Sequence, residues 1–405
     1  MDGERRPLRV LQSFPHKIGA GRICDTAWHQ ADGVAAAGAQ LTVFPGVVHR
    51  PLPPGVKVEP TLARGRWRIP YRAVGLTRAL ALHDRIVARR LARRPAEFDL
   101  VHAWPLGSME TLRTARRLGI PTVLERPNTH TRFAYAVVRD ECERLGVELP
   151  HDYEHAYNEQ LLAIEEEEYE LATGLLCPSD FVRQTFIDEG FDARKLVRHF
   201  YGYDEATFHP GERNPIRDRF TMLFAGLCAV RKGVHFALEA WLRSPASREG
   251  RFLIAGEFLP SYREKLAPLL AHPSVEVLGH REDVAELMRT SDVFVLPSIE
   301  EGSALAANEA IASGCVPLVS DRASGVCEHD VNSLVHAAMD IDQLTRQITS
   351  VYESAKLLSR LRDGCRATAP LMTWRRAGGR LVEVYRSVVE DSGRRASQPG
   401  VALTA

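Results

Sequence analysis

Two series of short apolar runs, each run followed by a helical stretch, constrain the fold of this chain most. Strands that are apolar on both faces are typical of parallel sheets covered by helices. Alternating strands and helices build right-handed βαβ units. Two such series therefore predict an α/β protein with two Rossmann-like, doubly wound domains. The runs are residues 9–14, 40–44, 100–103, 122–125 and 174–177, then 221–225, 251–255, 275–278, 293–296 and 316–319.

A polar stretch with Pro and Gly, residues 201–219, lacks helical periodicity and separates the two series. We therefore expect an N-terminal domain at 1–200, a linker at 201–219 and a C-terminal domain at 220–375. A C-terminal helix at 376–391 and a disordered tail at 392–405 would follow. Because open α/β sheets bind ligands beyond the carboxyl ends of their strands, two facing domains would form a cleft. Residues directly after strands are the candidates for function.

Charge and cysteine usage exclude several classes of protein. Lys and Arg together number 52, as do Asp and Glu, and this balance argues against a nucleic-acid-binding protein. The seven cysteines show no metal-ligand spacing, which argues against a zinc site or a disulfide framework. The sequence shows no signal peptide and no apolar run of about 20 residues. We expect a cytoplasmic protein, at most peripheral to the inner face of a membrane.

An Arg-rich stretch from Arg64 to Arg94, with Trp67 and Tyr71 interleaved, is the candidate for membrane contact. A solvated helix is the alternative, and the general excess of Arg over Lys in this chain favours that alternative.

The most informative stretch, residues 291–321, combines a strand, a loop with Gly302 and an Ala-rich helix that ends at Gly314. A helix N-terminus after such a loop suits a phosphate, here through the backbone N–H groups of Ser303, Ala304 and Leu305. Glu301 at the strand end and Glu309 in the helix could accept hydrogen bonds from sugar and ribose hydroxyls. The alternative is a capping Glu301 and a solvated Glu309, but the apolar surroundings favour the binding interpretation.

A second stretch, residues 223–241, carries a strand, the turn residue Gly226, the basic pair Arg231 and Lys232, and a helix. A diphosphate leaving group needs cations, and charge-assisted hydrogen bonds are the strong ones. Two solvated charges before a helix are an equally acceptable interpretation of this pair.

The N-terminal half gives weaker signals. Gly19 and Gly21 follow the first strand and permit close backbone approach, although a tight strand-to-helix turn explains them equally well. His130 lies shortly after the strand at 122–125 and is expected on the cleft side, while His102 ranks below it. A structural role is the alternative for each histidine.

Glu301 and Glu309, separated by seven residues, resemble the Glu-x7-Glu signature of retaining family 4 glycosyltransferases. Gly226, Lys232 and Gly233 resemble the family's Gly-Arg-Leu-x-x-x-Lys-Gly motif, with Leu227 at the usual Arg and Arg231 as a substitute charge. Segments 178–181 and 201–204 are also similar to the family. Ser303, Ala304 and Ala306 depart from the usual loop, which points to a different donor-sugar preference.

This resemblance implies the GT-B fold and transfer of a sugar from a nucleotide sugar to an acceptor hydroxyl with retained anomeric configuration. Glu301 would contact the donor sugar, Glu309 the ribose, and the loop with Gly19 and Gly21 would lie near the acceptor. The acceptor could be a sugar, a lipid-linked molecule or a small molecule in glycan or glycoconjugate biosynthesis. Glu301 and His130 are the catalytic candidates, and His130 would orient the donor sugar or stabilise developing charge through hydrogen bonds.

No metal cofactor is expected. Asp340 and Asp342 spell Asp-x-Asp, but they precede a helical stretch and are typical of helix capping. The charge run at residues 165–168 is interpreted as a solvated helix face.

Two other functions remain open. A nicotinamide-dependent enzyme would need a Gly-x-Gly-x-x-Gly turn, which the loop at residues 16–24 lacks because Cys24 takes the third glycine position. A non-catalytic protein that binds nucleotide sugars is favoured by Leu227, whereas Glu301, Glu309 and Lys232 argue against it.

Overall fold

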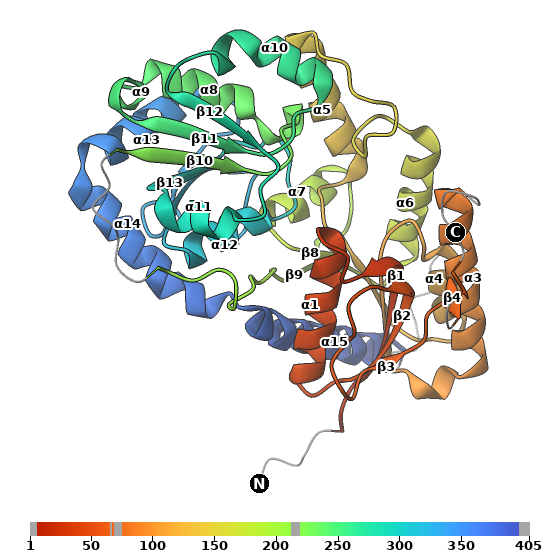
Figure 1. Ribbon diagram of the computed structural model, residues 1–405. Helices are drawn as coiled ribbons and strands as arrows, with labels where there is room; N and C mark the ends of the chain where they lie inside the picture. The colour runs from red at the N-terminus through yellow and green to blue at the C-terminus, as the bar shows by residue number, and fades with distance from the viewer. Residues whose placement is uncertain (1–5, 65–66, 69–74, 212–218, 397–405) are drawn as a thin grey trace.

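The computed structural model describes residues 6–64, 67–68, 75–211 and 219–396, which form two α/β domains that lie side by side (Figure 1). The first domain contains β1 (Arg9–Ile18), β2 (Gln40–Val48), β3 (Lys57–Val58), β6 (Leu100–Ala103), β7 (Thr122–Glu125), β8 (Gly174–Cys177) and β9 (Leu196–Arg198), with a small hairpin of β4 (Ala63–Arg64) and β5 (Trp67–Arg68). The second domain contains β10 (Thr221–Ala225), β11 (Arg251–Ala255), β12 (Val275–Gly279), β13 (Val293–Leu296), β14 (Val316–Ser320) and β15 (Leu334–His336).

Both sheets are parallel and doubly wound, as the sequence predicts. The strand order is β3-β2-β1-β6-β7-β8-β9 in the first sheet and β12-β11-β10-β13-β14-β15 in the second. The order therefore reverses beside β1 and beside β10, which are the positions where open α/β sheets bind their ligands. All five residues of β10 are buried, which explains why its sequence is apolar on both faces.

Helices cover both faces of the sheets. The first domain has α1 (Ile23–Ala36), α3 (Leu76–Arg93), α4 (Met109–Arg117), α5 (Thr131–Leu145), α6 (Glu159–Leu171) and α7 (Asp180–Asp188). The second has α8 (Val234–Arg243), α9 (Ala246–Glu249), α10 (Pro260–Leu270), α11 (Val284–Thr290), α12 (Leu305–Ala312), α13 (Ile341–Glu353) and α14 (Ala355–Thr368). Short 3-10 turns are η1 (Pro95–Glu97), η2 (Ala193–Lys195), η3 (Val230–Lys232) and η4 (Ala369–Leu371).

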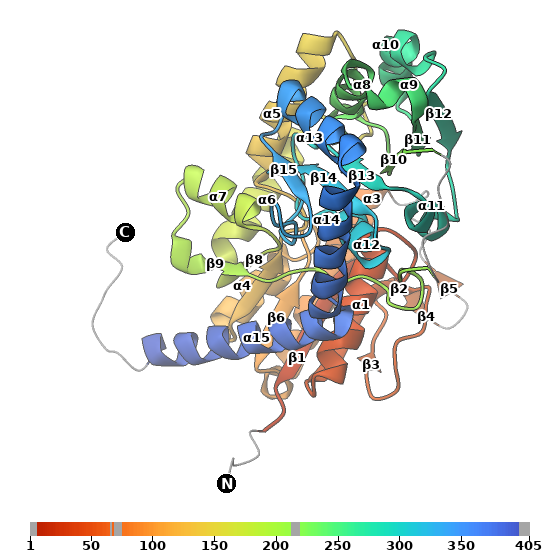
Figure 2. The same ribbon diagram turned by 90° about the vertical axis from the view of Figure 1, so that its left-hand side faces the viewer.

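The last helix, α15 (Trp374–Ala396), returns to the first domain and packs across α1 (Figure 2). Leu381 and Tyr385 belong to the same buried core as Val10 and Trp28. The predicted helix ended at 391 and was followed by a disordered tail, but residues 392–396 are helical. Residues 397–405 of that predicted tail lie outside the described residues, as do residues 212–218 of the predicted linker.

Helix α5 belongs to the first domain in sequence but also packs on the second. Val138, Cys142 and Leu145 join the core that β10 and β13 build. Glu141 of α5 accepts a hydrogen bond across 2.8 Å from Nε2 of His235 in α8. The two domains are thus joined by a buried contact as well as by the linker.

The charge run at residues 165–168 is only partly the solvated face that the sequence predicts, because Glu166 and Glu167 reach solvent whereas Glu165 and Glu168 do not. Glu165 accepts a hydrogen bond from Arg126 at 2.8 Å, and Glu168 accepts from the backbone N–H groups of Leu106 and Ser108. Glu165 and Glu168 are buried and point into the first domain, because α6 packs between α4 and α5.

The exposed face of α3 carries Arg78, Arg85 and Arg89. Membrane contact through the stretch from Arg64 to Arg94 stays a prediction, and Tyr71 within it lies outside the described residues. No helix in the described ranges is long and apolar enough to cross a bilayer.

Candidate donor site at the ends of β10 and β13

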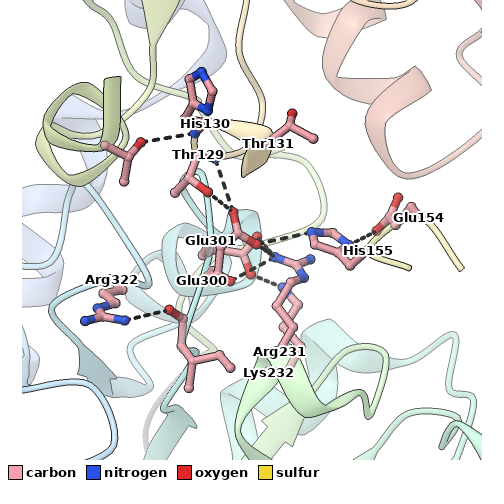
Figure 3. A network of polar contacts seen from close by, with 12 residues as sticks. Thr129, His130, Thr131, Glu154, His155, Arg231, Lys232, Glu300, Glu301 and Arg322 are labelled. Carbon is pink, nitrogen blue, oxygen red and sulfur yellow. Dashed lines mark hydrogen bonds and ion pairs between the residues drawn. The ribbon is translucent and has the colours of Figure 1, made fainter. Parts of the chain in front are cut away.

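The loop after β13 lies against η3, and a glycine makes this possible. Gly233 has a φ of +69°, and a Cβ there would lie 2.1 Å from the carbonyl oxygen of Pro297. The backbone N–H of Ile299 donates to the carbonyl of Arg231 at 2.9 Å. This pairing brings Arg231 and Lys232 beside Glu300 and Glu301 (Figure 3).

Two cations and two carboxylates balance one another in this cluster. The Lys232 ammonium forms an ion pair with Glu301. Nη1 of Arg231 lies 3.2 Å from Oε1 of Glu301 and 3.2 Å from Oε2 of Glu300. The structure therefore brings together Lys232, Arg231 and Glu301, which the sequence selected separately, and Arg231 takes the bridging position.

Burial and charge act on the cluster in opposite directions. Burial would raise the pKa of Glu301, but the nearby Arg231 and Lys232 bring that pKa below its ordinary value. Burial lowers the pKa of Lys232, and the Glu301 carboxylate offsets part of this effect. Glu301 is consequently ionised at neutral pH and is a weak base.

The predicted anion site uses the backbone N–H groups of Ser303, Ala304 and Leu305 at the start of a helix. In the structure, α12 begins only at Leu305. Ala304 is the N-cap, and its N–H donates to the carbonyl of Ala323 at 2.9 Å. The prediction that this N–H awaits a ligand is therefore wrong. The Ser303 hydroxyl accepts from the N–H of Gly325 at 3.4 Å. Leu305 is the first residue of the helix, so its N–H has no carbonyl within the helix.

Glu309 lies in the middle of α12 and is only half buried. Burial and the nearby Asp204 raise its pKa to about 7. Gly226 at the end of β10 has a φ of +143°, and its carbonyl oxygen would lie 1.8 Å from a Cβ placed at Gly256. Gly226 thus serves a close approach between two loops, and a contact between Gly226 and a nucleotide stays a prediction.

Sequence reasoning missed Glu300, which is the most connected residue of the cluster. Its Oε1 accepts from the N–H and the hydroxyl of Thr129 at 3.1 and 2.7 Å. Its Oε2 lies 3.2 Å from Nε2 of His155 and 3.2 Å from Arg231. The only signal in the sequence is its position beside Glu301 at a strand end.

His130 is not on the cleft side, where the sequence placed it. It is the N-cap of α5, and its Nδ1 accepts from the N–H of Arg132 at 3.2 Å. Its ring packs against Tyr169, Phe186 and Phe191, and Figure 3 shows it directed away from Glu300 and Glu301. Burial, with help from Arg126 and Arg132, lowers its pKa to about 3.

The remaining candidates have local structural roles. Gly19 and Gly21 have φ values of +76° and +86° in the turn between β1 and α1, and their acceptor role stays a prediction. His102 lies 3.4 Å from the buried Glu125. Asp340 caps α13 by accepting from the N–H of Gln343 at 2.7 Å, which confirms the capping interpretation.

Comparison with known proteins covers this part of the chain. Residues 219–354, which hold the whole Arg231–Glu309 region, match the family model described as glycosyl transferases group 1. A D-inositol 3-phosphate glycosyltransferase from Geodermatophilus obscurus is 27% identical over 92% of this chain and 85% of its own length. A glycogen synthase from Mycobacterium tuberculosis is 30% identical over half of each chain.

The chain is a glycosyltransferase whose second domain matches the group 1 family. Its fold is GT-B, shared with a sucrose-phosphate synthase from Thermosynechococcus elongatus that is 18% identical, with a TM-score of 0.67 over 96% of this chain and 100% of that one. HepE from Anabaena, solved in complex with UDP, is 15% identical, with a TM-score of 0.65 over 94% of this chain and 100% of HepE. In the glycosyltransferase, Arg231, Lys232 and Glu301 thus lie at the switch point of the second domain.

Proposed function

We propose that this glycosyltransferase takes a glycosyl group from a nucleoside diphosphate sugar, transfers it to an acceptor hydroxyl with retained configuration and releases the nucleoside diphosphate. The observation that carries the proposal is the contact of Arg231 and Lys232 with Glu301 beside the start of α12. HepE in complex with UDP and the similarity to an inositol phosphate glycosyltransferase support it.

The ion pairs suggest how a donor would enter the site. Lys232 and Arg231 are neutralised by carboxylates, so a diphosphate must compete with Glu301 for Lys232. Once the diphosphate takes over Lys232, the Glu301 carboxylate becomes free to accept hydrogen bonds from sugar hydroxyls. Glu309, about one turn after the start of α12, would accept from the ribose.

The acceptor would approach from the first domain, near the turn with Gly19 and Gly21. Its class stays open between a sugar, a lipid-linked molecule and a small molecule. We propose that the reaction needs no metal ion, because Arg231 and Lys232 supply the positive charge that the leaving diphosphate requires.

Opposite effects of two substitutions test the donor site. Titration calorimetry with UDP and with GDP should show binding to the wild-type protein. Lys232→Ala should weaken binding by about 10- to 100-fold, since a hydrogen bond to a charged group contributes roughly 1.5–3 kcal/mol. Glu301→Gln should strengthen it, because the carboxylate that competes for Lys232 is gone.

Lys57→Ala is the matched control, because Lys57 pairs with Glu59 at 3.3 Å on the first domain, away from this cluster. It should leave nucleotide affinity unchanged. Failure of both nucleotides to bind, or equal affinities in wild type and Lys232→Ala, would refute the assignment. Binding without any transfer or donor hydrolysis would instead support a non-catalytic nucleotide-sugar-binding protein.

A further inference from the structure

Glu300 is fully buried, with 0% of its surface exposed, yet it carries a charge. A buried carboxylate is stable only when donors and cations compensate for its lost hydration. Here the hydroxyl and N–H of Thr129 satisfy one oxygen, while His155 and Arg231 satisfy the other. The side chain has no surface left for a substrate, so any effect on the reaction must pass through these partners.

The donors to Glu300 come from both domains. Thr129 follows β7, and His155 lies before α6, so both belong to the first domain, whereas Arg231 belongs to η3 of the second. The loops themselves touch, because a Cβ at Gly302 would lie 1.7 Å from the carbonyl oxygen of Pro127. The contacts from Thr129 and His155 therefore cross from the first domain to the loop after β13 of the second.

Arg231 is oriented by this arrangement. Its Nη1 donates to the backbone carbonyl of Glu300 at 3.0 Å and contacts the carboxylates of Glu300 and Glu301. Without the Thr129 and His155 donors, Glu300 would keep only Arg231. The Glu300 carboxylate would then turn toward water, and the guanidinium would follow it.

We propose that Glu300 is a positioning residue through which Thr129 and His155 fix the orientation of Arg231 at the donor diphosphate. The inference rests on the proposed function of the donor site. It assigns Thr129 and His155 of the first domain a role in orienting a cation through the carboxylate that they bind.

The test asks whether the effect of Thr129 passes through Glu300. The readout is kcat/KM for release of nucleoside diphosphate from UDP-glucose or GDP-mannose, whichever binds, with water as acceptor. Thr129→Val removes one hydrogen bond at nearly constant volume and should lower kcat/KM roughly threefold to tenfold in the wild-type background. In the Glu300→Gln background the same substitution should change kcat/KM by less than about twofold, because coupled residues are not additive.

Two further variants separate positioning from folding. Thr129→Ser keeps the hydroxyl and should restore most of the activity, so the proposal stays testable even if Glu300→Gln does not fold. Thr61→Val is the matched control, because Thr61 is a buried threonine of the first domain that bonds His83 at 2.7 Å instead of Glu300. It should leave kcat/KM unchanged.

The inference is overturned if Thr129→Val has the same effect in both backgrounds, or if Thr129→Ser is as impaired as Thr129→Val. A wild-type protein that binds neither nucleotide and releases none from either donor would refute the proposed function instead. The two failures are therefore distinguishable.

Discussion

The ionisation of Glu309 falls within the pH range of an ordinary assay. Burial and Asp204 raise its pKa to about 7, so near neutral pH the protonated and ionised forms coexist. An ionised carboxylate only accepts hydrogen bonds, whereas the protonated form has given up part of that capacity. The proposed contact with ribose hydroxyls therefore depends on the loss of this proton.

Nucleoside diphosphate binding should tighten as the pH rises through 7. If only the ionised Glu309 binds, the gain is roughly tenfold between pH 6 and pH 8. Calorimetry at pH 6, 7 and 8 measures this gain. Glu309→Gln is the control: the variant lacks the carboxylate, so the pH dependence that it still shows comes from ionisation of the nucleotide. Equal pH dependence in the two proteins would show that Glu309 does not contact the nucleotide.

Site residues could be predicted from the sequence where they belong to a short motif. The motif around Glu301 and the pair Arg231 and Lys232 select residues that the fold does bring together. His130 is different, because its position after a strand does not reveal that Tyr169, Phe186 and Phe191 surround it. Those three aromatic residues come from α6, from α7 and from the turn after α7, at least 39 positions away, where a single sequence gives no signal.

Among the secondary-structure elements, the contact of α1 with α15 fixes the return of the chain to the first domain. The helices cross at two glycines, because a Cβ at Gly378 would lie 2.1 Å from the carbonyl carbon of Gly33. Gly379, the next residue of α15, has no atom within 4 Å of its Cβ position. Substitutions at Gly378 and Gly379 can therefore distinguish the effect of helix packing on stability from the effect of helix propensity.

Gly378→Ala should destabilise the protein by roughly 1–3 kcal/mol through overpacking, although alanine is the better helix former. Gly379→Ala should stabilise it by up to about 1 kcal/mol, because only the propensity changes. Thermal unfolding followed by circular dichroism measures both effects as shifts in Tm of opposite sign. Two shifts of the same sign would mean that the helices do not cross at these glycines.

Interior strands could be predicted from sequence, as could the edge strand β12, but the edge strands β3, β9 and β15 could not. The runs at β6, β7, β8, β10, β11 and β13 are mainly apolar because helices cover both faces of the sheets. The edge strands β9 and β15 have only three residues each, with partly exposed side chains, so neither length nor periodicity marks them. The buried Glu165 and Glu168 were missed because a charge run normally indicates solvent.

At the scale of the whole molecule, the contacts of Glu300 with residues far away in the sequence could not be predicted. Glu300 is separated by 171 positions from Thr129, by 145 from His155 and by 69 from Arg231. Only the facing arrangement of the two domains brings these residues together. The two-domain fold could be predicted from its strand and helix pattern, but the ionic contacts between the domains could not.

The ionic contacts around the donor site also bear on the stereochemistry of transfer. Inversion needs a general base that takes the acceptor proton on the face opposite the leaving group. Glu300 is held well below its ordinary pKa despite burial, chiefly by Arg231, and the pKa of Glu301 is lowered as well. The pKa of His130 is about 3. These three groups are weak bases, whereas an oxygen of the leaving diphosphate can take the proton on the donor's own face.

An α-linked nucleotide sugar should therefore give an α product, in a reaction that proceeds equally well in EDTA. Proton NMR of the sugar released to water from UDP-glucose or GDP-mannose, recorded before mutarotation, identifies the anomer formed first. A β anomer from an α donor would mean that a base outside this cluster acts on the opposite face. Loss of activity in EDTA with recovery on adding Mn²⁺ would show that Arg231 and Lys232 do not suffice for the leaving diphosphate. An α anomer formed at an unchanged rate in EDTA would mean that the leaving diphosphate takes the acceptor proton and that Arg231 and Lys232 neutralise the charge of this leaving group.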